Sequence, residues 1–141
     1  MINPSHVGRT YPATPPYTVS EAKIAEFARA LGDENSAYRG RDAVAPPTFA
    51  ALIAAQAWGS FFDDPELGLA LERTMHAEQR FEVTRPLRVG DEVVARLTIE
   101  KVRARGVTAF VTLRVDLETT DGESLGAATS TLVHTAAEED A

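Results

Sequence analysis

The 141-residue sequence contains no cysteine, which excludes a disulfide framework, a thiolate metal site and a cysteine nucleophile. It has no apolar run near the ~20 residues that a bilayer span requires, and no cluster of lysine and arginine. The formal net charge of -7 and the pI near 4.9 argue against nucleic acid as a partner. The first residues also lack the basic and apolar stretches of a secretory signal. We therefore expect a cytoplasmic protein that binds neither membranes nor nucleic acid.

The composition is that of an ordinary globular chain, with 44% apolar and 25% charged residues. At this length one domain is expected, and it can bury roughly 70% of the surface of its unfolded chain. We expect residues 1–141 to form that single domain. Residues 1–17, rich in proline, are expected to form an extended lead-in, and residues 136–141 an acidic, frayed tail.

Two helices are expected in the first half of the chain. Thr18 and Glu21 have the spacing of a capping box, apolar residues follow with helical period, and Gly32 stands where a C-cap glycine belongs. A second helix opens at Pro47 and runs to about Phe62. It is apolar nearly all round, which predicts burial on most sides.

From about residue 74 onward, apolar and polar residues alternate with a period of two. This pattern predicts long strands at about 74–86, 93–100, 107–118 and 125–133, with hairpin turns near Gly106 and Gly122. Strands of this kind belong to antiparallel sheets with one wet face. A strongly apolar helix followed by such strands predicts an α+β protein, in which a sheet of five or more antiparallel strands packs on the helix.

One short segment carries a catalytic motif in altered form. Residues 32–38 read Gly-Asp-Glu-Asn-Ser-Ala-Tyr and resemble the Gly-Asp-x-Asn-Pro-x-His loop of the MaoC-like (R)-specific hydratases and dehydratases, whose Asp and His transfer protons. The resemblance puts Asp33 and Asn35 at motif positions but Tyr38 where the His belongs. It also puts Pro47 at the glycine whose N–H donates to the thioester carbonyl. A phenol of pKa ~10 is a poor base at neutral pH and proline has no N–H, so the dyad is expected to be inactive in isolation.

A second resemblance covers residues 76–91, which follow the pattern H-x-x-Q-x-F-x-x-x-R-P-L-x-x-G-D. This pattern is similar to FAS1-like dehydratase domains and N-terminal MaoC-like domains, and with residues 7–11 and 45–49 the similarity spans about residues 5–135. It implies a hot-dog fold, a single antiparallel sheet wrapped around the central apolar helix. The substrate-binding positions expected from it are Pro47, Thr48, Phe49, His76 and Gln79. No metal and no cofactor is expected.

Plainer roles compete with each of these assignments. Asp33 after a helix end is also a common turn residue, and Tyr38 suits a packed, hydrogen-bonded aromatic. His76 at a strand start can be a satisfied polar residue, and Phe49 falls at core spacing. The sequence therefore leaves turn, packing and core roles open for these residues beside the functional ones.

The nearest likeness is to the recognition subunit of two-chain (3R)-hydroxyacyl-thioester dehydratases. It implies a chain that binds an acyl-CoA or acyl-carrier-protein thioester and pairs with a catalytic MaoC-like subunit. One alternative is a homodimeric acyl-thioester binding or regulatory protein without catalysis. Another is a hydratase or thioesterase-like enzyme with a variant site.

Overall fold

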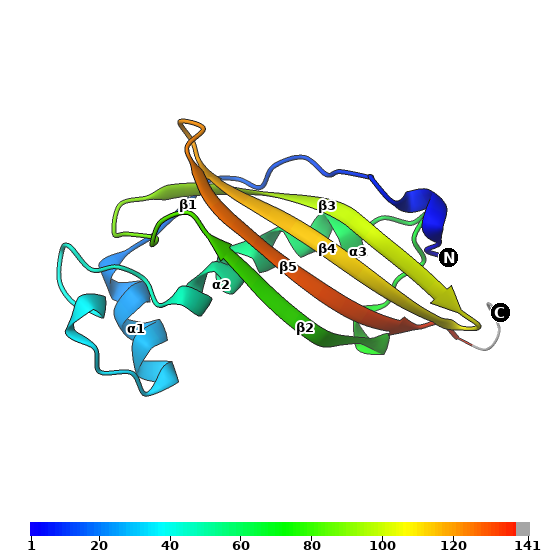
Figure 1. The fold of residues 1–141 in the computed structure, drawn as a ribbon, viewed down its shortest axis with the longest axis horizontal. Coiled ribbons are helices and arrows are strands. Elements are labelled where there is room, and N and C mark those ends of the chain that lie inside the picture. Colours follow the sequence, from blue (N-terminus) through cyan, green and yellow to red (C-terminus); the bar gives the residue numbers. More distant parts are fainter. Residues whose placement is uncertain (138–141) are drawn as a thin grey trace.

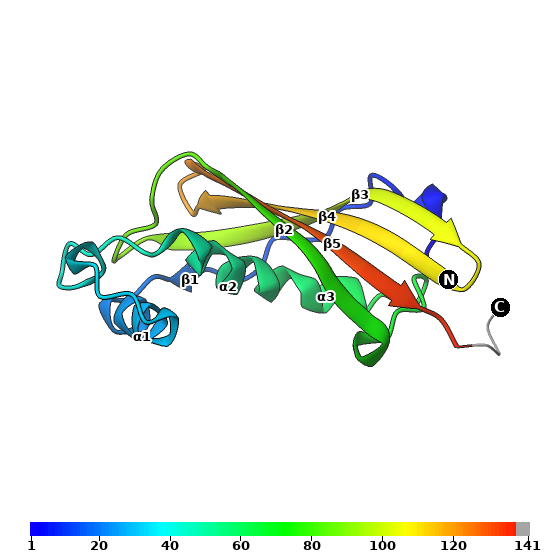
Figure 2. The same cartoon turned by 60° about the horizontal axis from the view of Figure 1, so that its bottom comes forward.

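The structure is a computed structural model that describes residues 1–137. A five-stranded antiparallel sheet of order β1-β3-β4-β5-β2 curls around one long helical run, which confirms the α+β hot-dog arrangement (Figures 1 and 2). The strands are β1 Tyr17–Thr18, β2 Thr74–Val83, β3 Glu92–Arg105, β4 Thr108–Thr119 and β5 Ser124–Thr135. The four long strands lie where they are predicted, whereas the two-residue β1 is too short to have a periodic signal. Beyond residue 137 the predicted tail lies outside the described residues, and the one-domain organisation stays a prediction.

The central helix joins four short segments into one helical run. They are the 3₁₀ turn Pro47–Phe49, α2 Ala50–Ala54, the 3₁₀ turn Ala55–Ala57 and α3 Trp58–Phe62. The backbone stays right-handed helical at the junctions, with φ -62° and ψ -23° at Ala55, so the prediction of one helix is confirmed.

Only part of the central helix is buried. One face, which includes Phe49, Ile53 and Phe61, packs into the core of the sheet. Another face, which includes Ala55 and Gly59, is exposed. The expectation of burial on most sides is therefore wrong for this face. Alanine and glycine count as apolar in the sequence pattern, but exposing such small side chains to water costs little free energy.

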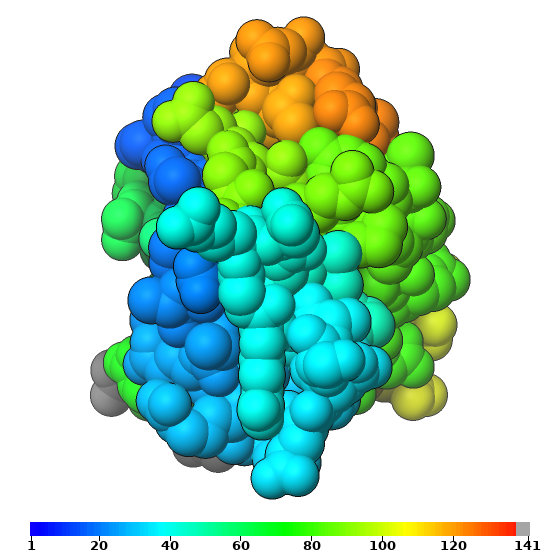
Figure 3. Space-filling view, turned by 90° about the vertical axis from the view of Figure 1, so that its left-hand side faces the viewer, coloured from blue at the N-terminus to red at the C-terminus, as the bar shows by residue number. Residues whose placement is uncertain are grey.

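Helix α1 spans Glu21–Leu31 and lies at one end of the molecule, beside the loop 32–47 (Figures 1 and 3). Its N-cap is Ser20, whose hydroxyl accepts the Lys23 N–H at 3.1 Å. The capping box predicted from Thr18 is wrong, because Thr18 is already committed to β1. Gly32 has a φ of +67° and ends the helix as predicted.

The two edges of the sheet differ. Residues 8–14 run along the outer side of β3, and the N–H groups of Gly8, Tyr11 and Thr14 donate to β3 carbonyls at 2.8 to 3.0 Å (Figure 1). Residues 8–14 are therefore packed against the sheet. At the opposite edge, no strand of the described residues pairs with the outer side of β2, where Met75 and Val83 are exposed.

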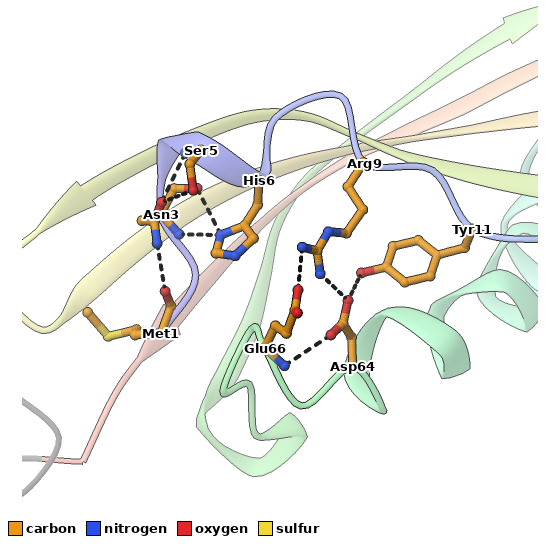
Figure 4. Close-up of polar contacts among 8 residues, drawn as sticks. All are labelled: Met1, Asn3, Ser5, His6, Arg9, Tyr11, Asp64 and Glu66. Carbon is orange, nitrogen blue, oxygen red and sulfur yellow. Dashed lines mark hydrogen bonds and ion pairs between the residues drawn. The ribbon is translucent and has the colours of Figure 1, made fainter.

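The lead-in is anchored to the segment that follows α3. Asp64 accepts hydrogen bonds from Arg9 at 2.7 Å and from the Tyr11 hydroxyl at 2.6 Å, and Arg9 also pairs with Glu66 (Figure 4). The Tyr11 hydrogen bond, together with that from Arg9, lowers the pKa of the Asp64 carboxyl despite its burial. The carboxylate therefore stays ionised and anchors Arg9 and Tyr11 to the segment after α3.

A second ion cluster joins the β2–β3 connection to the β4–β5 hairpin. Arg85 donates to both oxygens of Asp91 at 2.8 and 3.0 Å and to Glu123 at 2.7 Å. Arg85 and Asp91 belong to the R-P-L-x-x-G-D pattern, which connects β2 to β3. Among the described residues no helix is long and apolar enough to cross a membrane.

Candidate functional site

The motif loop is shaped by its own polar side chains. Asp33 accepts the backbone N–H of Asn35 at 3.0 Å, and Asn35 accepts that of Ala37 at 3.0 Å. Asn35 thereby caps the short 3₁₀ turn Ser36–Tyr38. Both motif residues hold the turn, as short polar side chains commonly do.

A cavity of about 460 Å³ lies between this loop and the sheet. The loop, the start of the central helix, the end of β2 and the adjoining ends of β4 and β5 contribute to its wall. Its apolar lining includes Pro47, Ala50, Phe81, Leu117 and Leu125. The volume and the apolar wall are those of a small-molecule site.

The charged groups of this wall are already paired. Glu82 pairs with Arg114 at 3.0 Å, and Arg85 is held by Asp91 and Glu123. The hydrogen bonds that Arg85 donates to Asp91 and Glu123 raise the pKa of Arg85 further above its usual range, against a smaller opposing effect of burial. The cavity therefore presents an apolar interior, with Asn35 and Tyr38 as polar groups at its loop side.

A separate, more polar recess of about 370 Å³ lies on the other side of the loop, against α1. Asp33, Arg29 and Arg39 line it, and Tyr38 lines both hollows. The fold thus gathers Asn35, Tyr38 and Pro47 around the apolar cavity, while Asp33 faces the recess.

The other predicted substrate-binding residues lie outside the cavity lining. Thr48 is exposed, and Phe49 is fully buried with its ring edge-on to Phe27 at 5.2 Å. Nearer the start of β2, His76 packs edge-on against Trp58 with ring centroids 5.4 Å apart, and Gln79 accepts a hydrogen bond from the Ser130 hydroxyl at 2.7 Å. Contact of these side chains with a substrate stays a prediction.

Sequence reasoning missed most of the cavity wall. Phe81 had a signal, since it is the aromatic of the H-x-x-Q-x-F pattern. Leu117, Leu125 and Ala127 had none, because residues from two different strands meet only in the folded sheet.

The curled sheet over its helix, with an apolar cavity at the helix start, defines the MaoC-like class of hot-dog proteins. The chain belongs to the family described as the FAS1-like, dehydratase domain region, whose model matches residues 5–127. A UPF0336 protein of Cutibacterium acnes is 54% identical over 140 residues, covering 99% of both chains.

The solved structures that share the fold include two dehydratases. A chain of the C-terminally truncated HadBC complex, a (3R)-hydroxyacyl-ACP dehydratase from Mycobacterium tuberculosis, is 27% identical with a TM-score of 0.79, over 91% of this chain and 96% of that one. A MaoC-like dehydratase is 25% identical with a TM-score of 0.84, over 96% of this chain and 44% of that one. This chain thus matches somewhat less than half of the latter protein.

Proposed function

We propose that this chain is a cytoplasmic, acyl-thioester-binding subunit of a (3R)-hydroxyacyl-thioester dehydratase or enoyl-thioester hydratase, inactive without a catalytic MaoC-like chain. The observation that carries the proposal is the apolar cavity beside the motif loop. An acyl chain of a CoA or carrier-protein thioester is the apolar ligand that suits it. The likeness to a chain of a dehydratase complex adds support.

The chemistry of the loop supports an inactive site. Dehydration needs a base for the proton α to the thioester, an acid for the departing hydroxyl and donors for the developing oxyanion. Tyr38 at the histidine position is a poor base, and Pro47 at the donor position has no N–H. Asp33 is engaged in the turn and lines the recess rather than the cavity.

The unpaired outer edge of β2 supports the proposal that a second chain pairs with this one. An unpaired strand edge is a template for a further strand from another chain. Phe81 and Val83 belong to β2 and also line the cavity. A chain added to this edge would therefore lie next to the cavity and could complete the site with its own Asp and His.

A homodimeric binding protein without catalysis is the second candidate, and the charges of β2 favour it. Glu78, Arg80 and Glu82 alternate along one face of the strand. Two copies paired antiparallel about Gln79 would set each Glu78 opposite an Arg80 of the other copy, and opposite charges in such pairs are stabilising.

Calorimetric titration with dodecanoyl-CoA tests the proposal. The larger side chain of Ala50→Trp should occupy the cavity that Ala50 lines. It should weaken binding at least about tenfold, since most of the acyl chain's apolar contact is lost. Ala51→Trp, one position along the helix and outside the lining, is the matched control and should bind like the unchanged chain. If the unchanged chain does not bind dodecanoyl-CoA, the proposal is wrong.

A further inference from the structure

We propose that Asn35 and Tyr38 form a two-donor clamp that holds a neutral carbonyl oxygen at the rim of the apolar cavity. The ligand class is an acyl ester or thioester with its carbonyl at the motif loop and its tail against the adjoining ends of β2, β4 and β5. This inference rests on the proposed function and assigns these two residues a binding role in place of proton transfer.

Both side chains have hydrogen-bond donors that are not used by the described residues. The Asn35 side-chain oxygen is occupied by the Ala37 N–H, which leaves the amide NH₂ with two donors. The Tyr38 hydroxyl has no hydrogen-bond partner among the described residues, and it is not a buried orphan. Both side chains line the cavity.

The loop brings the pair to the same cavity. Asn35 caps the 3₁₀ turn that ends at Tyr38, so the two residues stand at the start and the end of one short turn. Both side chains line the cavity at this turn. A single acceptor atom with two lone pairs, placed between them, can take one hydrogen bond from each.

Charge selects a carbonyl over a carboxylate. Arg85 is the cation of the cavity lining, and two carboxylates already hold it. Asp33 and Glu34 adjoin the clamp, and the whole chain carries -7. A carboxylate placed there would lose solvation without gaining a free cation, whereas a neutral carbonyl oxygen needs only the two hydrogen bonds.

Burial sets the direction of the tail. Asn35 is exposed and Tyr38 half-buried, while Leu117 and Leu125 are only 3% and 4% exposed. The polar head thus belongs at the loop, and the apolar tail belongs among the side chains of the strands.

A pair of ligands that differ by one oxygen tests the clamp on the full chain. Dodecanoyl-CoA has the thioester carbonyl, and the thioether S-dodecyl-CoA lacks it. Tyr38→Phe removes only the hydroxyl. It should weaken thioester binding about two- to tenfold, the range for one neutral hydrogen bond, and should leave thioether binding unchanged. Asn35→Asp keeps the acceptor for Ala37 but replaces the donors with a carboxylate, and should lower the thioester-to-thioether ratio further.

The outcomes separate the two proposals. If neither ligand binds the unchanged chain, the acyl-binding function fails and the clamp with it. If both bind equally well, or Tyr38→Phe leaves the ratio of their affinities unchanged, the clamp is wrong, whereas binding of the acyl chain in the cavity is still supported. Free dodecanoate binding more tightly than dodecanoyl-CoA would overturn the selection for a neutral carbonyl.

Discussion

His134 shows how a single buried residue ties the stability of this protein to pH. It is 2% exposed on β5, and its Nε2 accepts the backbone N–H of Ala70 at 3.2 Å. Only a neutral imidazole can accept that hydrogen bond. Burial, and to a lesser degree Arg73, lowers the pKa of His134 below its ordinary value.

The sign of the pH effect follows from this lowered pKa. Below about pH 6.5 the unfolded chain binds a proton at this position more readily than the folded chain does. Above about pH 6.5, His134 should therefore make its whole contribution to the free energy of unfolding. As the pH is lowered below that value, the free energy of unfolding should fall by at most about 1.4 kcal/mol per pH unit because of this residue. Urea unfolding across pH 7.5 to 5 should show the decline. His134→Gln can still accept from Ala70 without titrating and should flatten it. An unchanged slope in the variant would contradict the assignment.

Gly126 is required by a close approach of two backbones. Its φ is +120°, and a Cβ there would lie 1.9 Å from the carbonyl oxygen of Glu82. Gly126→Ala should cost at least about 3 kcal/mol of unfolding free energy and distort the end of β2 that lines the cavity. Gly59→Ala is the matched control, because a Cβ meets nothing within 4 Å there and alanine favours the helix by about 0.5–1 kcal/mol. Denaturation curves of the two variants should move in opposite directions.

At the scale of elements, the Arg85 cluster fixes the β2–β3 connection against the β4–β5 hairpin. Its side chains are sheltered, with Arg85 20% and Asp91 15% exposed. Arg85→Ala leaves Asp91 without its main partner and should cost about 1–3 kcal/mol. Arg114 pairs with Glu82 and Asp116 in a more exposed setting, so Arg114→Ala should cost only about 0–1 kcal/mol. In thermal unfolding, Arg85→Ala should therefore lose more stability than Arg114→Ala. Equal losses would show that the solvent exposure of the ion pair does not determine its contribution to stability here.

The elements differ in how far the sequence specifies them. The long strands and the central helix repeat their pattern over many residues, so their positions can be predicted. The helix cap could not be, because Thr18 and Ser20 both have suitable side chains, and only the pairing of β1 with β3 decides between them. The cavity is the hardest case, since Pro47, Phe81 and Leu125 come from three distant segments. The motif fixes the loop alone, and the tertiary structure supplies the rest of the wall.

At the scale of the whole molecule, the unequal edges of the sheet determine how it can assemble. The lead-in covers β3, so a further strand can add only at β2 among the described edges. Arg80→Glu would leave three like charges on β2 and should weaken self-association at least about tenfold in sedimentation experiments. Arg103→Glu makes the same charge change on β3 and is the control. Equal effects of both variants would argue against assembly through β2.

We propose that this chain binds the acyl thioester while another chain supplies the chemistry. The most direct measurement is hydration of trans-2-dodecenoyl-CoA by the pure chain, by a MaoC-like chain with an intact Gly-Asp-x-Asn-Pro-x-His motif from the same organism, and by their mixture. We expect no turnover by this chain alone and activity in the mixture well above that of the partner. We also expect Ala50→Trp to abolish the gain. Turnover by the pure chain that is lost in Asp33→Ala, or a partner fully active by itself, would rule out this division of roles between two chains.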